Sequence, residues 1–188
     1  MTRWYERFEA WMERRGCCRS IYRSVPNGEP VLYLKRYYIL RTPWGEVMLH
    51  QFFLGDDGPV HDHPFASCGW IIATGYNELI RRPWPGNTII METIRRWPGQ
   101  FSWRPRASKN HNLASSFHKV ELIPGTEGKV HTLFITGPRN EGSTWGFATP
   151  NGFVSFADMF HKDGTEQKQT NPAQWGYGFF PKNKKKAA

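Results

Sequence analysis

The chain has 188 residues and a formal net charge of +9; 39% of its residues are hydrophobic, 15% aromatic and 22% charged. This length predicts one domain with extensions, and the composition excludes a collagen, a coiled coil and a wholly disordered chain. No run of about 18 apolar residues occurs, so no membrane span is expected. An odd number of cysteines, with Cys17 and Cys18 adjacent, predicts reduced thiols and a cytoplasmic protein.

The first element in chain order is a predicted amphipathic helix over residues 3–15. Trp4, Phe8 and Trp11 recur at helical spacing, and Gly16 marks the end of the pattern. A stripe of this kind serves either to bind a partner or to cover an open end of the domain. We expect the second arrangement.

Short segments rich in β-branched and aromatic residues follow, separated by Gly and Pro. In chain order the predicted strands are Val31–Arg41, Glu46–Leu54, Trp70–Ile80, Thr88–Trp97, Phe101–Arg104, His118–Ile123, Thr132–Thr136, Trp145–Thr149 and Phe153–Phe156. Many short strands without a long helix between them predict an all-β sandwich or barrel.

The chain divides into a helix with its linker (1–24), a β-barrel domain (25–163) and a C-terminal extension (164–188). Aromatic residues in the extension predict packing on the domain, whereas Lys182 and Lys184–Lys186 predict a solvated basic tail. The excess of Lys and Arg over Asp and Glu favours polyanionic partners, which include nucleic acid and phosphorylated metabolites. The charge alone does not distinguish between these partners.

The most informative pair of residues is His61 and His63. On an extended strand both imidazoles project from one face, while Asp62 projects from the other. Two neutral imidazole nitrogens on one face can reach a single metal ion at about 2 Å. A lone His-x-His pair is a weak signal, and two surface histidines without a metal would produce the same pattern.

The segment 55–75 resembles the first motif of the cupin superfamily, Gly-x5-His-x-His-x3–4-Glu-x6-Gly. Gly55, His61, His63 and Gly75 fit this frame, and Cys68 stands where the family usually has its ligand glutamate. The resemblance implies that both histidines are metal ligands. Cys68 is then either a thiolate ligand, which would favour zinc, or a small residue that lines the barrel.

The second cupin motif begins Gly-x5-Pro, and Gly99 to Pro105 reproduces this spacing. The motif implies a further metal-binding histidine on the facing strand. His118 opens a strand-like His-Lys-Val-Glu-Leu and is the preferred candidate. His111 lies closer to the usual offset and remains the alternative.

Within the cupin superfamily, the chain is similar to small cupin-fold proteins of phages and prophages, most of which have no assigned activity. The similarity covers roughly residues 30–160 and runs through 33–40, 49–65, 118–122, 132–138 and 145–154. It implies a cupin-type double-stranded β-helix, the jelly roll, with a metal inside the barrel near one mouth. The similarity to phage proteins also implies that the protein is located in the cytoplasm of a host cell.

Three neutral imidazoles leave the full double positive charge on the metal, which suits Fe(II), Zn(II), Ni(II) or Mn(II). Three-histidine sites occur among the cupins that resemble thiol dioxygenases, so the resemblance implies a bound Fe(II) and an oxygenation reaction. His50 shares a strand face with the apolar Met48 and is expected to line the interior, and Tyr76 and Glu78 are candidate general acids or bases.

The sequence thus predicts a metal-dependent dioxygenase or isomerase that acts on a small, anionic substrate. The alternative is a non-catalytic binding protein or phage accessory protein whose basic surface contacts nucleic acid or another polyanion. Aromatic strand edges also favour a homodimer.

Overall fold

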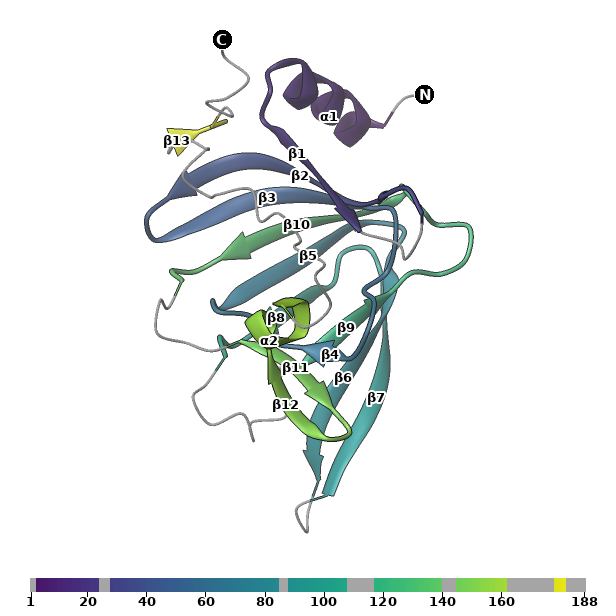
Figure 1. Cartoon of the computed structure of the whole chain (residues 1–188). Helices are drawn as coiled ribbons and strands as arrows, with labels where there is room; N and C mark the ends of the chain where they lie inside the picture. The colour runs from purple at the N-terminus through teal and green to yellow at the C-terminus, as the bar shows by residue number, and fades with distance from the viewer. Residues whose placement is uncertain are drawn as a thin grey trace.

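Two antiparallel sheets face each other and enclose the core of the molecule (Figure 1). The computed structural model describes residues 3–23, 28–84, 88–107, 117–139, 145–161 and 178–181. Sheet A has the order β1 (Cys18–Arg23), β2 (Val31–Thr42), β3 (Gly45–Phe52), β10 (Val130–Thr136), β5 (Ser67–Ala73) and β8 (Phe101–Arg104), and β13 (Gly178–Phe179) also pairs with β2. Sheet B has the order β12 (Gly152–Ser155), β11 (Gly146–Thr149), β4 (Val60–His61), β9 (His118–Glu121), β6 (Tyr76–Trp84) and β7 (Thr88–Arg96).

The chain crosses repeatedly from one sheet to the other. It passes from β3 in sheet A to β4 in sheet B and back to β5, and the same exchange recurs at β8, β9 and β10. Such alternation between two facing antiparallel sheets is the jelly-roll topology. The predicted all-β double-stranded β-helix is confirmed.

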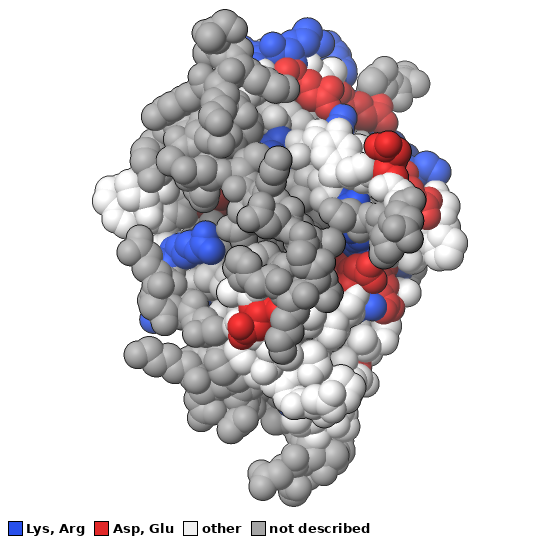
Figure 2. All heavy atoms as spheres, viewed as in Figure 1, with Lys and Arg blue, Asp and Glu red and all other residues white. Residues whose placement is uncertain are grey.

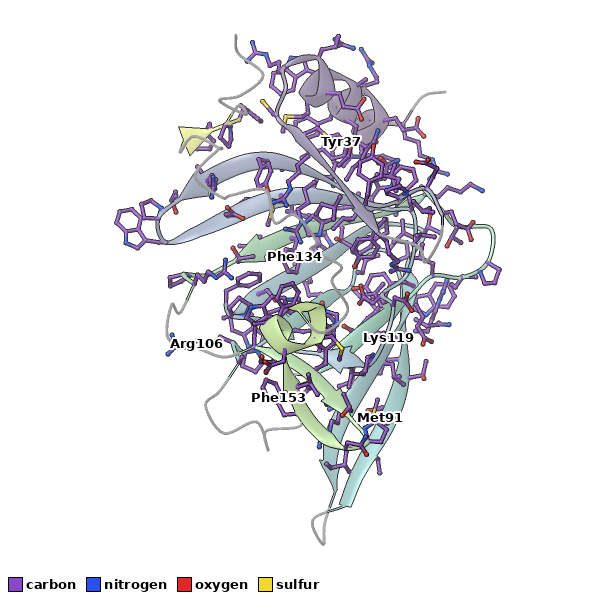
Figure 3. All side chains as sticks on the ribbon, viewed as in Figure 1. Tyr37, Met91, Arg106, Lys119, Phe134 and Phe153 are labelled. Carbon is purple, nitrogen blue, oxygen red and sulfur yellow. The ribbon has the colours of Figure 1, made fainter. Side chains whose placement is uncertain are left out.

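Side chains from both sheets fill the space between them (Figure 3). Strand residues alternate between the two faces of a sheet, so every second residue points inward. The buried apolar cluster between the sheets comprises Leu34, Phe52, Ile71, Tyr76, Val120 and Val130. This cluster contains residues from both sheets and holds them together.

Helix α1 (Trp4–Arg14) covers the outer face of sheet A and not, as had been expected, an open end of the domain, because its apolar stripe packs on Tyr37 and Leu49 of β2 and β3. Met12 packs on Tyr37, which lies beneath the helix (Figure 3). Glu9 Oε1 lies 2.8 Å from Nε2 of His131 on β10, and both side chains are buried. Apolar and polar contacts therefore both fix α1 to the barrel.

Three local features differ from the sequence prediction. Residues 18–23, expected in a linker, form β1 at the edge of sheet A. The predicted strand Trp70–Ile80 is divided by a turn in which Gly75 has φ +88, and a Cβ there would collide with the carbonyl oxygen of Arg96. A short helix, α2 (Phe156–His161), begins where the last barrel strand was expected to end.

The C-terminal extension is described only at residues 178–181. Phe180 packs against the cluster beneath α1, as expected of the aromatic residues of this extension, whereas Phe179 is exposed and Trp175 and Tyr177 lie outside the described residues. The predicted basic tail at Lys182 and Lys184–Lys186 lies outside the described residues. Within the described part of the chain, neither helix has the length and apolar character needed to cross a bilayer.

Candidate metal centre

The strand order of sheet B brings two of the predicted ligands together. Strand β4 pairs with β9, and His61 lies directly opposite His118 in their register. Residues directly opposite each other in an antiparallel pair project from the same face, so both imidazoles point the same way. His63 follows His61 by two residues and joins them from the end of β4.

The three rings are arranged symmetrically. Each pair of ring centroids among His61, His63 and His118 is separated by 5.1 Å. One nitrogen from each ring lies within 4.8 Å of the other two, and the Nε2 atoms of His63 and His118 are 2.9 Å apart. Nitrogens about 2.1 Å from one ion are separated by about 3.0 Å at a right angle. The arrangement therefore fits a single metal ion.

The electrostatic environment keeps these imidazoles neutral. Burial lowers the pKa of His61, and it lowers the pKa of His63 and of His118 well below the usual value. The positive charge of Arg104 adds to the lowering for all three. A neutral imidazole offers the lone pair that a metal requires, so the site is preset for coordination at neutral pH.

Glu78 holds His118 in place from behind. Its Oε1 lies 3.0 Å from Nδ1 of His118, and its Oε2 accepts a hydrogen bond from Nε of Arg96 at 2.6 Å. Arg104 pairs with the same carboxylate. A carboxylate that accepts from Nδ1–H leaves Nε2 of the imidazole unprotonated and aimed at the metal position.

These contacts describe the position of Glu78, and its predicted role as a general acid or base stays a prediction. The side chain of Glu78 is 0% exposed, and both oxygens are engaged by His118 and the two arginines. The contacts suit a positioning residue. No local sequence pattern indicates them, because they depend on the register between β6 and β9, in which Ile80 lies opposite His118.

Cys68 also departs from its predicted place. It lies opposite Ile135 on β10 and Trp103 on β8, and both of these side chains are exposed on the outer face of sheet A. Cys68 therefore points away from the barrel interior, which rules against its lining the barrel or binding the metal. The shorter spacing of the same motif ends on Ser67, whose side chain is buried on the inner face.

The remaining candidates have separate positions. Tyr76 is buried in the apolar cluster, with its ring 6.3 Å from that of Phe52, and burial raises its pKa. No described contact joins it to the histidines, and a catalytic role for Tyr76 stays a prediction. His50 lies on the inner face of β3, in stacking contact with Phe134 at 4.8 Å. His111 lies outside the described residues.

No family model and no curated protein matches the chain. Solved structures similar to it include KdgF from a Halomonas species, with 18% identity, a TM-score of 0.41 and coverage of 64% of this chain and 89% of that one. A cupin-2 domain protein from Rhodospirillum rubrum is 13% identical, with a TM-score of 0.47 and coverage of 78% and 87%. The DMSP lyase DddQ from Ruegeria pomeroyi is 13% identical, with a TM-score of 0.42 and coverage of 71% and 63%.

Strand order, register and side-chain geometry together define a jelly-roll domain with a candidate three-histidine metal centre between its sheets. A fold of this kind hosts many reactions, so function has to be argued from the site.

Proposed function

We propose that the chain is a divalent-metal enzyme that acts on a small anionic substrate. The observation that carries the proposal is the convergence of His61, His63 and His118, with Glu78 fixing the orientation of the third ring. A carboxylate behind a histidine is the usual support of a metal-binding imidazole. The spacing of the nitrogens and the neutral state of the rings both support a resident ion.

The donor set suits Fe(II), Zn(II), Ni(II) or Mn(II). When bound, such an ion would polarise a substrate oxygen, activate water or support oxygen chemistry. We place dioxygenase-like chemistry with iron first, because three neutral imidazoles leave the charge of the ion uncompensated and coordination positions open. Isomerase or lyase chemistry is the next candidate. The outward position of Cys68 supports an all-nitrogen set.

Aromatic and cationic side chains lie around the triad. Phe65 stacks on His63 with ring centroids 5.5 Å apart, and Phe134 lies 6.4 Å from the same ring. The positive charges of Arg104 and Arg36 both act on His63. Positive charge at the site favours an anionic ligand over a neutral one.

The test is turnover by the full-length chain after metal removal and reloading with each of the four ions. Oxygen uptake is measured with a panel of small carboxylates and thiols, and product formation with sugar acids and hydroxy acids. We expect turnover with one ion, and none in the metal-free chain or in His61→Ala/His63→Ala. Turnover that is equal with and without metal would overturn the proposal.

The alternative is a binding or phage accessory protein. On the face shown in Figure 2, described Lys and Arg residues lie among Asp and Glu rather than in one patch. The basic tail that motivated nucleic-acid binding lies outside the described residues, so this partner stays a prediction. Affinity for a DNA or RNA oligomer that falls steeply with salt, and weakens on removal of residues 182–188, would support it.

A homodimer is also proposed. The edge strand β8 and its neighbour β5 present aromatic side chains on the outer face of sheet A: Trp70 and Phe101 stack 5.4 Å apart, and Trp103 is exposed beside them. Sedimentation equilibrium of the wild type and of Trp103→Ser distinguishes a dimer from a monomer.

We also propose that the protein is located in the cytoplasm of a host cell.

A further inference from the structure

A row of cationic and polar side chains crosses the inner face of sheet A at one level. Arg19 on β1 lies opposite Arg36 on β2, and Arg36 lies opposite His50 on β3. The next inward-facing pair along the same strands is Leu34 and Phe52, which belong to the apolar core. By alternation, the row therefore faces sheet B.

The positive charges of this row are not neutralised by acidic side chains among the described residues. Like charges directly opposite each other on neighbouring strands destabilise a sheet, and Arg19 and Arg36 have no acidic partner among the described residues. Nε of Arg36 and Nε2 of His50 are both buried without a hydrogen-bond partner, and the side chain of His50 is only 4% exposed. Buried polar atoms are normally paired, so these nitrogens indicate a missing acceptor.

The row lies next to the metal centre. The ring of Phe134, on the neighbouring strand β10, stacks on His50 at 4.8 Å and lies 6.4 Å from His63. The positive charge of Arg36 contributes to lowering the pKa of both His50 and His63. Arg36 and His50 are thus close to the triad, on the opposite sheet.

We propose that Arg36, flanked by Arg19 and His50, binds the oxyanion group of the substrate, a carboxylate or a phosphate, while the other end of the substrate reaches the histidine triad. The guanidinium group forms two parallel hydrogen bonds to either oxyanion, and Nε2–H of His50 donates a third. This inference rests on the proposed function, because it specifies the substrate class of the same site. Its residues belong to sheet A, and the metal ligands belong to sheet B and the residues after β4.

Binding of simple oxyanions to the full-length chain tests the inference. Malonate, succinate and inorganic phosphate are titrated calorimetrically into the metal-free and the Zn(II)-loaded chain, at one ionic strength set with chloride. We expect binding of at least one probe in both metal states, weakened tenfold or more in Arg36→Gln and by less in Arg36→Lys. Preference for phosphate or for a dicarboxylate identifies the oxyanion.

The matched control is Lys35→Gln, which removes one positive charge from the adjacent position of β2 on the opposite face, where Lys35 pairs with Glu13. Its affinity for the probes is expected to equal that of the wild type. His50→Phe preserves an aromatic ring and is expected to weaken binding even if Arg36→Gln fails to fold. Equal affinity in wild type and in either folded variant, or no binding by the wild type in either metal state, would overturn the inference.

The metal content of each variant keeps the two proposals separate. Arg36→Gln and His50→Phe are expected to retain the metal-to-chain ratio of the wild type while losing anion affinity. A wild type that binds anions but takes up no metal would contradict the proposed function and leave the oxyanion site standing.

Discussion

The Nε2 atoms of His63 and His118 lie 2.9 Å apart although 55 positions separate the two residues in the chain. Their proximity follows from the pairing of β4 with β9, which sets His61 opposite His118 and brings His63 in from the end of the strand. Two imidazole nitrogens at this separation, both held neutral by burial, are placed so that they could bind one ion together with His61.

The role of Glu78 leads to the first prediction. Glu78→Gln keeps the size of the side chain but removes the negative charge that faces Nδ1 of His118 and the two arginines. Loss of a supporting carboxylate of this kind typically lowers metal affinity by about 10–100-fold. Competition with a chromophoric chelator measures the change.

Glu92→Gln on β7 is the matched control. Glu92 is exposed and pairs with Arg82 on the neighbouring strand, and Ile80 on β6 separates it from His118 in the sheet. Its metal affinity is expected to equal that of the wild type. Equal affinities of Glu78→Gln and Glu92→Gln would show that Glu78 does not support the metal ligand.

The second prediction concerns the pH dependence of stability in the metal-free chain. Burial, and to a lesser extent the positive charge of Arg36, holds the pKa of His50 well below 6.5 in the folded state. In the unfolded chain His50 is therefore protonated as the pH falls through about 6.5, whereas in the folded chain it stays neutral at that pH. The contribution of His50 to stability is complete above pH 6.5, and it falls with pH below that value by at most about 1.4 kcal/mol per pH unit.

Urea denaturation at pH 7.5, 6.5 and 5.5, with a chelator present, measures this dependence. His50→Phe is expected to lose less stability than the wild type between pH 6.5 and 5.5, because one titrating group is gone. The slope that remains belongs largely to the three buried ligands. A variant whose stability falls as steeply as that of the wild type would show that His50 is protonated in the folded chain.

The third prediction concerns the attachment of α1. Met12 is 0% exposed beneath the helix, in the cluster that contains Tyr37 and Leu49. Met12→Ala removes buried side-chain volume there and is expected to lower the free energy of unfolding by about 2–5 kcal/mol. Trp4→Ala, at a position 65% exposed on the same helix, is expected to change it by less than about 0.5 kcal/mol. Similar losses in both variants would contradict the packing of α1 described above.

Local patterns predicted the features that depend on neighbouring residues. Helical periodicity identified α1, and the two-residue spacing of His61 and His63 correctly put both rings on one face. The strand-like His-Lys-Val-Glu-Leu favoured His118 over His111, although His111 lies closer to the offset of the cupin motif, and His118 is the residue opposite His61. Each of these features depends on the chain within a few residues.

Strand register explains what the sequence left undetermined. Whether Ser67 or Cys68 points inward depends on the pairing of β5 with β10 and β8, and a shift of one residue would reverse the faces. The contact of Glu78 with His118 depends in the same way on β6 and β9. The row of Arg19, Arg36 and His50 requires two such registers at once, so no single stretch of sequence reveals it.

The most direct test of the central claim is the metal-to-chain ratio of the wild type, of His61→Ala/His63→Ala and of His50→Phe, purified without added metal or a histidine tag. Elemental analysis is expected to give about one ion per chain in the wild type and in His50→Phe, and none in the double variant. The same measurement identifies the ion. A double variant that keeps its metal, or a wild type that remains metal-free after reconstitution with all four ions, would contradict the three-histidine centre.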